Sequence, residues 1–214
     1  MNFLDYLSSR WDNLLELGLE HAAVTIVAVL IATVVGVGLG MATYAHPRSR
    51  QLLIATTSVF LTIPSLALFG LFINVFGIGT ISVVIALVMY SLLPIVANTV
   101  VGLREVDPAV VESAQGMGMS RAQRLVRIEL PLAWPVILTG MRVSTLITLG
   151  ITAIGAYIQG PGLGNDIFAG VSRLSSPNAL NLVLGGTLGV VVLAVLFDLL
   201  YVLLGRLTTP RGIR

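Results

Sequence analysis

VVESAQGMGMSRAQRLVRIELP, residues 110–131, is the one long charged stretch inside an otherwise apolar chain. It carries Glu112 and the arginines Arg121, Arg124 and Arg127 among small and apolar residues. The segment shortly before it, residues 51–103, has no charged side chain at all. A patterned polar segment in such a setting indicates a place where the chain leaves its apolar surroundings, so its pattern bears on fold and function together.

Composition places the whole chain in a lipid environment. Of its 214 residues, 56% are hydrophobic and only 10% are charged, whereas a soluble domain carries about 25% charged residues. The net charge of +2 and the sparse arginines give little support for nucleic-acid binding. The chain has no cysteine, which excludes disulfides and thiolate metal sites.

Long uncharged runs predict an all-α integral membrane protein with five transmembrane helices. A spanning helix needs about 20 mostly apolar residues, and the second and third runs are separated by Gly77-Ile78-Gly79. The predicted spans cover residues 22–44, 52–76, 80–102, 132–156 and 180–205, approximately. With residues 104–131 as a loop, they form one membrane domain over residues 21–206.

The positions of the arginines predict the orientation, because loops on the cytoplasmic side are enriched in basic residues. In a five-span chain one side would hold only Arg10 and Arg173. The other side would hold the larger set: Arg48, Arg50, Arg104, Arg121, Arg124, Arg127, Arg206, Arg211 and Arg214. The N-terminus is therefore expected outside, and the C-terminus, with a tail over residues 207–214, inside.

Residues 1–20 have apolar side chains at helical spacing with acids between them, which favours a short helix lying in the membrane interface. A frayed tail is the alternative. The segment lacks the basic start of a signal peptide.

The polar loop has its own helix signals. Asp107-Pro108 is typical of a helix start, with a capping acceptor followed by proline in the first turn. We expect a short helix from Pro108 to about Gly116, ended by Gly116 and Gly118.

Ser120 and Gln123 have the spacing of a capping box, which predicts a second short helix. Leu125 and Ile128 would face apolar cover, and Leu130-Pro131 would end this helix before the fourth span. A folded helical cap of this size suits the docking of another protein.

The loop resembles the EAA motif of type I ABC import permeases: E-A-A, three residues, G, nine residues, then I-x-L-P. The match here is Glu112-Ser113-Ala114, Gly118, Ile128, Leu130 and Pro131. The spacing is intact, and Ser113 in place of alanine is a change from one small residue to another.

The resemblance implies that the loop is a coupling helix seated in a cleft of a separate ATPase subunit. The residues expected at this contact are Glu112, Ser113, Ala114, Gly118, Met119, Ser120, Arg121, Ile128, Leu130 and Pro131. Glu112 would pair with a basic group of the ATPase, or alternatively cap its own helix. Closure of the ATPases on ATP would switch the spans between inward-facing and outward-facing states.

The resemblance also implies the partners and the location. We expect a second permease subunit, identical or related, two ATPase subunits and an external substrate-binding protein, all at a bacterial inner membrane. The chain would be a transport subunit and not an enzyme, with no cofactor of its own, because ATP and Mg²⁺ would bind the partner ATPase. GVGLG at 36–40 lies within a span and is not a phosphate-binding loop.

Four stretches look like the osmoprotectant branch, which imports glycine betaine, choline, carnitine and proline: His21, residues 62–70, 155–170 and 197–201. Pro161 interrupts the glycine run of the third stretch and departs from the branch pattern. A permease for methionine or another small solute is the alternative.

Prolines and glycines suggest where the pathway or gate lies. Pro64, next to Ser65, and Pro94 fall inside predicted spans, where proline frees a carbonyl and kinks a helix. Gly162 and Gly164 belong to the glycine run. A structural kink without a role in transport is the alternative for the prolines.

Two charges fall inside predicted spans, Arg142 in the fourth and Asp198 in the fifth. Because an isolated charge is costly in lipid, we expect these two side chains to approach one another or to share a polar site. The alternative is that Arg142 extends to the cytoplasmic interface.

The sequence bears on two other protein classes. An intramembrane metalloprotease would need a motif such as HExxH, but the only histidines are His21 and His46, and an aspartyl mechanism would need a second membrane acid besides Asp198. A channel remains an alternative, although it has no need of a patterned docking loop.

Overall fold

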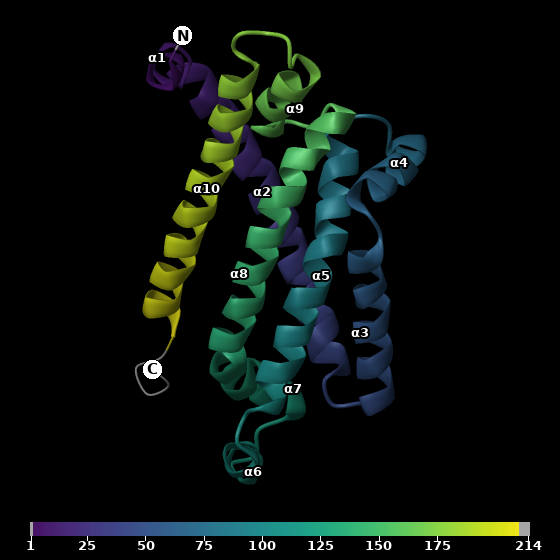
Figure 1. Cartoon of the computed structure of the whole chain (residues 1–214). Helices are drawn as coiled ribbons and strands as arrows, with labels where there is room; N and C mark the ends of the chain where they lie inside the picture. Colours follow the sequence, from purple (N-terminus) through teal and green to yellow (C-terminus); the bar gives the residue numbers. More distant parts are fainter. Residues whose placement is uncertain (1, 210–214) are drawn as a thin grey trace.

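The computed structural model describes residues 2–209 and is a helical bundle, in which the long helices run along a common axis and short helices lie at the two ends (Figure 1). The helices are α1 (Phe3–Ser9), α2 (Trp11–Thr43), α3 (Pro47–Thr62), α4 (Ser65–Phe76), α5 (Thr80–Arg104), α6 (Pro108–Gly116), α7 (Arg121–Arg124), the π-helical turn η1 (Leu125–Glu129), α8 (Leu130–Gly155), the 3-10 turn η2 (Ala156–Ile158), α9 (Gly164–Ser172) and α10 (Ala179–Thr208).

Two opposite ends of the bundle can be told apart in Figure 1. Helices α1, α4 and α9 gather at one, which we call the α9 end, and α6 and α7 lie at the other, the α6 end. The predicted tail lies partly in α10, and its residues 210–214, with Arg211 and Arg214, lie outside the described residues.

Four helical segments are long and apolar enough to cross a membrane, and a bent pair of helices makes a fifth candidate. The four segments are Trp11–Thr43, Thr80–Arg104, Arg121–Ile158 and Ala179–Thr208. The predicted break at 77–79 is confirmed, since Gly77 and Gly79 have φ of 81° and 111°, in the left-handed region that favours glycine.

The second predicted span, 52–76, is not one straight helix, which corrects that expectation. Helices α3 and α4 meet at an angle of 98°. Pro64 restricts Ile63 to an extended conformation, with φ −76° and ψ 126°, and this ends α3. The Tyr90 hydroxyl donates a hydrogen bond of 2.5 Å to the Ile63 carbonyl, so the break does not leave that oxygen unpaired.

The first apolar helix begins at Trp11, well before the expected start at residue 22. The expected single helix over residues 1–20 is therefore divided, since α1 ends at Ser9 and the later residues form the first turns of α2. Gly18 does not interrupt the helix, and the helical pattern continues into the apolar run.

The core is formed where α2, α5 and α8 pack closely. A Cβ on Gly36 would lie 2.9 Å from Ile95 Cγ2, and one on Gly40 would lie 2.6 Å from Thr99 Cγ2, so α2 and α5 touch where only glycine fits. Small residues allow membrane helices to approach in this way. Helix α5 continues through Pro94 without a break.

Candidate functional site

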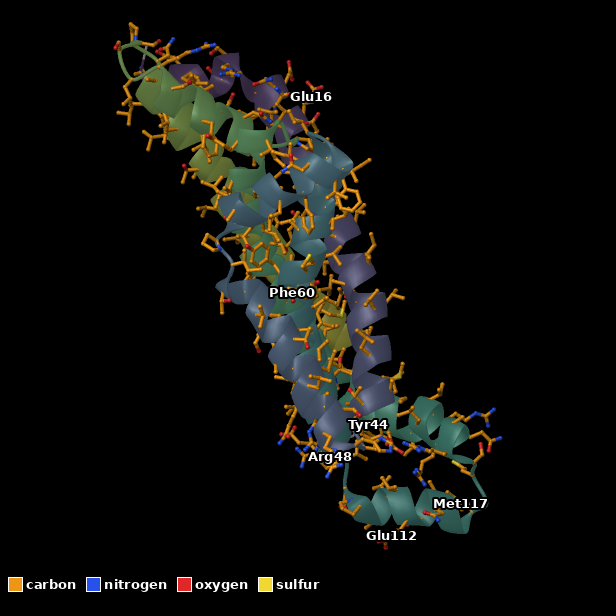
Figure 2. All side chains as sticks on the ribbon, turned by 90° about the vertical axis from the view of Figure 1, so that its right-hand side faces the viewer. Glu16, Tyr44, Arg48, Phe60, Glu112 and Met117 are labelled. Atoms are coloured by element: carbon orange, nitrogen blue, oxygen red, sulfur yellow. The ribbon has the colours of Figure 1, made fainter. Side chains whose placement is uncertain are left out.

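The segment from Pro108 to Gly116 forms α6, as predicted. The Asp107 carboxylate accepts a hydrogen bond of 2.8 Å from the Ala109 N–H and caps the helix. Since Asp107 is the cap, the alternative role for Glu112 as the cap of its own helix is wrong. Figure 2 shows Glu112 and Met117 beyond the bundle, below Tyr44 and Arg48.

Helix α6 is mostly open to its surroundings. Glu112 and Ser113 are exposed, and Met117 is 71% exposed. Ala114, by contrast, is buried, because α6 rests on α7 and η1. The predicted coupling residues are thus divided into an exposed face around Glu112 and a face that holds α6 in place.

The glycines at the tip of α6 are also open. Among residues 2–209, nothing lies within 4 Å of a Cβ built on Gly116 or Gly118. Gly118 has φ of 80°, which ends the helix as expected. Ser113 and Gly118 of the motif therefore border free space, whereas Ala114 does not.

The predicted capping box is confirmed. The Ser120 hydroxyl accepts a bond of 3.3 Å from the Gln123 N–H, and the Gln123 side chain accepts one of 2.9 Å from the Ser120 N–H. Arg121 is exposed at the first position of α7, and Met119 is half-buried.

The expected helix end at Leu130-Pro131 is wrong. The chain stays helical from Arg121 to Ile158, through the π-helical turn η1. In this turn the Leu130 N–H donates to the Leu125 carbonyl, five residues back. Proline normally clashes with the turn before it, and the wider π turn accommodates Pro131. Leu130 and Ile128 are half-buried, and Pro131 is exposed.

A buried acid lies behind this turn. Glu129 is 3% exposed, and its Oε1 accepts a hydrogen bond of 2.8 Å from Arg124 Nε. Its Oε2 accepts one of 2.8 Å from the hydroxyl of Tyr44, at the end of α2. Glu129 is not among the residues expected at the contact with the ATPase. The signal was one acid among three arginines directly before a span.

Arg142 and Asp198 lie together between α8 and α10. Arg142 Nε donates a hydrogen bond of 2.6 Å to Asp198 Oδ1, and Arg142 Nη2 lies 2.6 Å from the same oxygen. The two side chains are 41% and 35% exposed. The expected approach of these two charges is therefore present in the fold.

The candidate gate residues lie at three separate places in the fold. Pro64 and Ser65 form the bend between α3 and α4. The Pro94 carbonyl would lie 2.6 Å from a Cβ on Gly140, so it marks a close approach of α5 to α8.

Gly162 and Gly164 close the turn between α8 and α9. The Gly162 N–H donates a bond of 3.1 Å to Glu20 Oε2, and a Cβ there would lie 2.8 Å from His21 Cβ. A Cβ on Gly164 would lie only 2.0 Å from the Ala153 carbonyl oxygen. The glycine run thus serves close packing of α9 onto α2 and α8.

A second buried acid, Asp166, lies at the α9 end and was also missed. It is 5% exposed, and its oxygens accept a bond of 3.2 Å from Arg10 and one of 3.4 Å from the Tyr6 hydroxyl. Burial raises the pKa of the Tyr6 phenol, and the nearby Asp166 carboxylate raises it further. This cluster ties α1 to α9.

Within residues 2–209, no three His, Asp or Glu side chains are grouped so that they could hold a metal ion. The geometry of the α6 end is that of a contact surface, with exposed groups on a small folded segment and internal bonds behind it.

Comparison with known proteins relates nearly the whole chain to transport proteins. The family described as binding-protein-dependent transport system inner membrane component matches residues 21–209. Relatives include the choline transport system permease protein OpuBB of Bacillus subtilis, 34% identical over all of this chain and 96% of the relative. The osmoprotectant import permease protein OsmW of Salmonella typhimurium is 36% identical, with both chains covered in full.

Solved structures share the fold. An inward-facing structure of the MetNI methionine ABC transporter aligns with a TM-score of 0.80 over 92% of this chain and 96% of that chain, at 21% identity. An amino acid ABC transporter aligns with a TM-score of 0.74 over 96% and 98% of the two chains, at 20% identity. The chain, an integral membrane protein, belongs to the family of binding-protein-dependent transport system inner membrane components.

Proposed function

We propose that this chain is the permease subunit of an ATP-driven importer for osmoprotectants such as glycine betaine, choline, carnitine or proline. In this proposal the α6 end faces the cytoplasm, so the N-terminus lies outside and the C-terminus inside. The arginines near this end, Arg48, Arg50 and Arg104 among them, support that orientation.

The observation that carries the proposal is the exposed segment of α6, with Glu112, Ser113 and Gly118 bordering free space at one end of a membrane bundle. Such a segment suits a cleft in a separate ATPase subunit, where Glu112 pairs with a basic group. ATP and Mg²⁺ bind that ATPase, and its closure on ATP moves α6 and tilts the spans. A second permease subunit completes the pathway.

The substrate class is supported by relatives that cover the full chain. A glycine betaine/carnitine/choline permease, OpuCB of Bacillus subtilis, is 33% identical over 99% of this chain. An external binding protein selects the solute before it reaches the permease.

The test is uptake into proteoliposomes that contain this chain with its ATPase and its external binding protein. Labelled glycine betaine, choline, carnitine and methionine are compared with and without ATP. ATP-dependent uptake of one or more of the quaternary amines is expected. Uptake of methionine alone would overturn the substrate class, and conduction without the ATPase would favour a channel.

A further inference from the structure

Glu129 lies at the junction of segments that are distant in sequence. Its carboxylate is held from one side by Arg124 of α7 and from the other by Tyr44 at the end of α2, each at 2.8 Å. The side chain of Arg124 is only 17% exposed. A buried carboxylate is stable only when its oxygens have donors, and here each oxygen has one.

Both partners of Glu129 make further contacts. The Arg124 guanidinium also donates a longer bond of 3.5 Å to Gln115 Oε1 on α6. The carbonyl of Tyr44 accepts a bond of 3.1 Å from Arg50 on α3. A polar chain of contacts therefore runs from α6 through Glu129 to the corner between α2 and α3.

Covalent connections from α6 reach only some of the spans directly. Residues 105–107 join α6 to α5, and α7 with η1 joins it to α8. Helices α2 and α3 have no direct chain connection to α6, and the Tyr44–Glu129 bond joins their corner to the loop. Tyr44 and Leu125 also pack against the same apolar cluster around Leu103 and Ile137.

We propose that Glu129 is a positioning residue that makes the α2–α3 corner follow the α6 segment during the transport cycle. The inference rests on the proposed function, since it assumes that an ATPase moves α6. A carboxylate that accepts hydrogen bonds from an arginine and a tyrosine hydroxyl fixes the direction of the contact between the two segments. Apolar contacts alone would allow one segment to slide past the other.

The test uses the full assembly in proteoliposomes and measures ATP hydrolysed per glycine betaine transported. Glu129→Gln keeps the shape of the side chain but removes the charge. We expect this ratio to rise about fivefold or more, because a hydrogen bond to a charged group contributes roughly a factor of ten to an equilibrium constant. A residue that only stabilised the fold would reduce the amount of complex and leave the ratio unchanged.

Two further variants make the test independent of folding losses. Tyr44→Phe removes one donor and keeps the Arg124 pair, so the ratio is expected to rise by less than it does for Glu129→Gln. The double variant, Glu129→Gln with Tyr44→Phe, should hydrolyse no more ATP per glycine betaine transported than Glu129→Gln alone. Arg127→Gln, an exposed position of the same turn, is the matched control and should keep the wild-type ratio.

The outcomes separate this inference from the proposed function. If the wild-type assembly shows no ATP-dependent uptake of any quaternary amine, the proposed function fails. If the wild type couples normally and both Glu129→Gln and Tyr44→Phe keep its ratio, the positioning role of Glu129 alone is overturned.

Discussion

The glycines of α9 and those at the tip of α6 lie in opposite surroundings. At the α9 end, a Cβ on Gly164 would lie 2.0 Å from the Ala153 carbonyl oxygen, and one on Gly170 would lie 2.6 Å from the Ala179 carbonyl oxygen. At the α6 end, in the part of the chain that the structure describes, Gly116 and Gly118 border open space. The glycines of α9 are packed against their own chain, whereas those at the tip of α6 leave room for a second molecule.

The buried acids follow the same division. Asp166 and Glu129 each take an arginine and a tyrosine hydroxyl as donors. Asp166 joins α1 to α9, both of which lie at the α9 end. Glu129 joins the α6 end to the rest of the bundle. The same combination of acid, arginine and tyrosine is thus expected to stabilise the fold at the α9 end and to couple ATP hydrolysis to transport at the α6 end.

Gly164→Ala should have the largest effect, because its methyl group would overlap backbone that cannot move aside. We expect a loss of about 3 kcal/mol or more in stability, the upper part of the range for overpacking. Thermal unfolding in detergent, followed by tryptophan fluorescence, measures it. Gly116→Ala is the matched control and should change stability little, and equal losses in the two variants would contradict the difference between the ends.

Glu112→Lys should abolish most transport while leaving the fold intact. The reversed charge on an exposed position would repel the basic group expected on the ATPase, and ATP-dependent uptake should fall about tenfold or more. Uptake and thermal unfolding are measured on the same preparation. An unchanged uptake rate would show that the exposed face of α6 is not the contact.

Asp166→Asn should lower stability without loosening coupling. Removing one partner of this mostly buried pair should cost about 1–3 kcal/mol, since Arg10, 32% exposed, keeps some access to water. The ATP hydrolysed per solute should stay at the wild-type value. A rise comparable to that of Glu129→Gln would mean that the two acids do not differ in role.

Substitutions of Arg142 and Asp198 should have the smallest effect on stability. Both side chains are partly exposed, and polar contacts between membrane helices contribute about 1 kcal/mol. Arg142→Gln or Asp198→Asn should each destabilise by about that amount, and the double variant by less than the sum. If the stability lost in the double variant equals the sum of the losses in the two single variants, as measured by thermal unfolding, the two side chains do not form an ion pair within the membrane.

Much of this fold can be predicted from the sequence because the signals are local. The uncharged runs, the Asp107 cap and the Ser120–Gln123 capping box each depend on neighbouring residues. The errors arose where the outcome depends on neighbours in space or on a rare geometry. Proline signalled a possible break at Pro64, Pro94 and Pro131 alike, but only Pro64 ends a helix.

The missed acids show the same limit. Glu129 and Asp166 matter through Tyr44 and Tyr6, which lie 85 and 160 residues away in the sequence. Arg142 and Asp198 were paired correctly because charges inside apolar runs have few alternatives. An acid in a polar loop has no such apolar surroundings in the sequence, so an acid that becomes buried in the fold looks like one that stays exposed.

The most direct measurement of the central claim is site-directed cross-linking from the α6 end. The chain has no cysteine, so Met117→Cys can carry a single thiol-attached photo-cross-linker in the assembled transporter. Leu174→Cys, 78% exposed as leucine in the segment after α9, is the matched position at the other end. We predict cross-links to the ATPase subunit from position 117 and none from position 174; the reverse pattern would contradict the account.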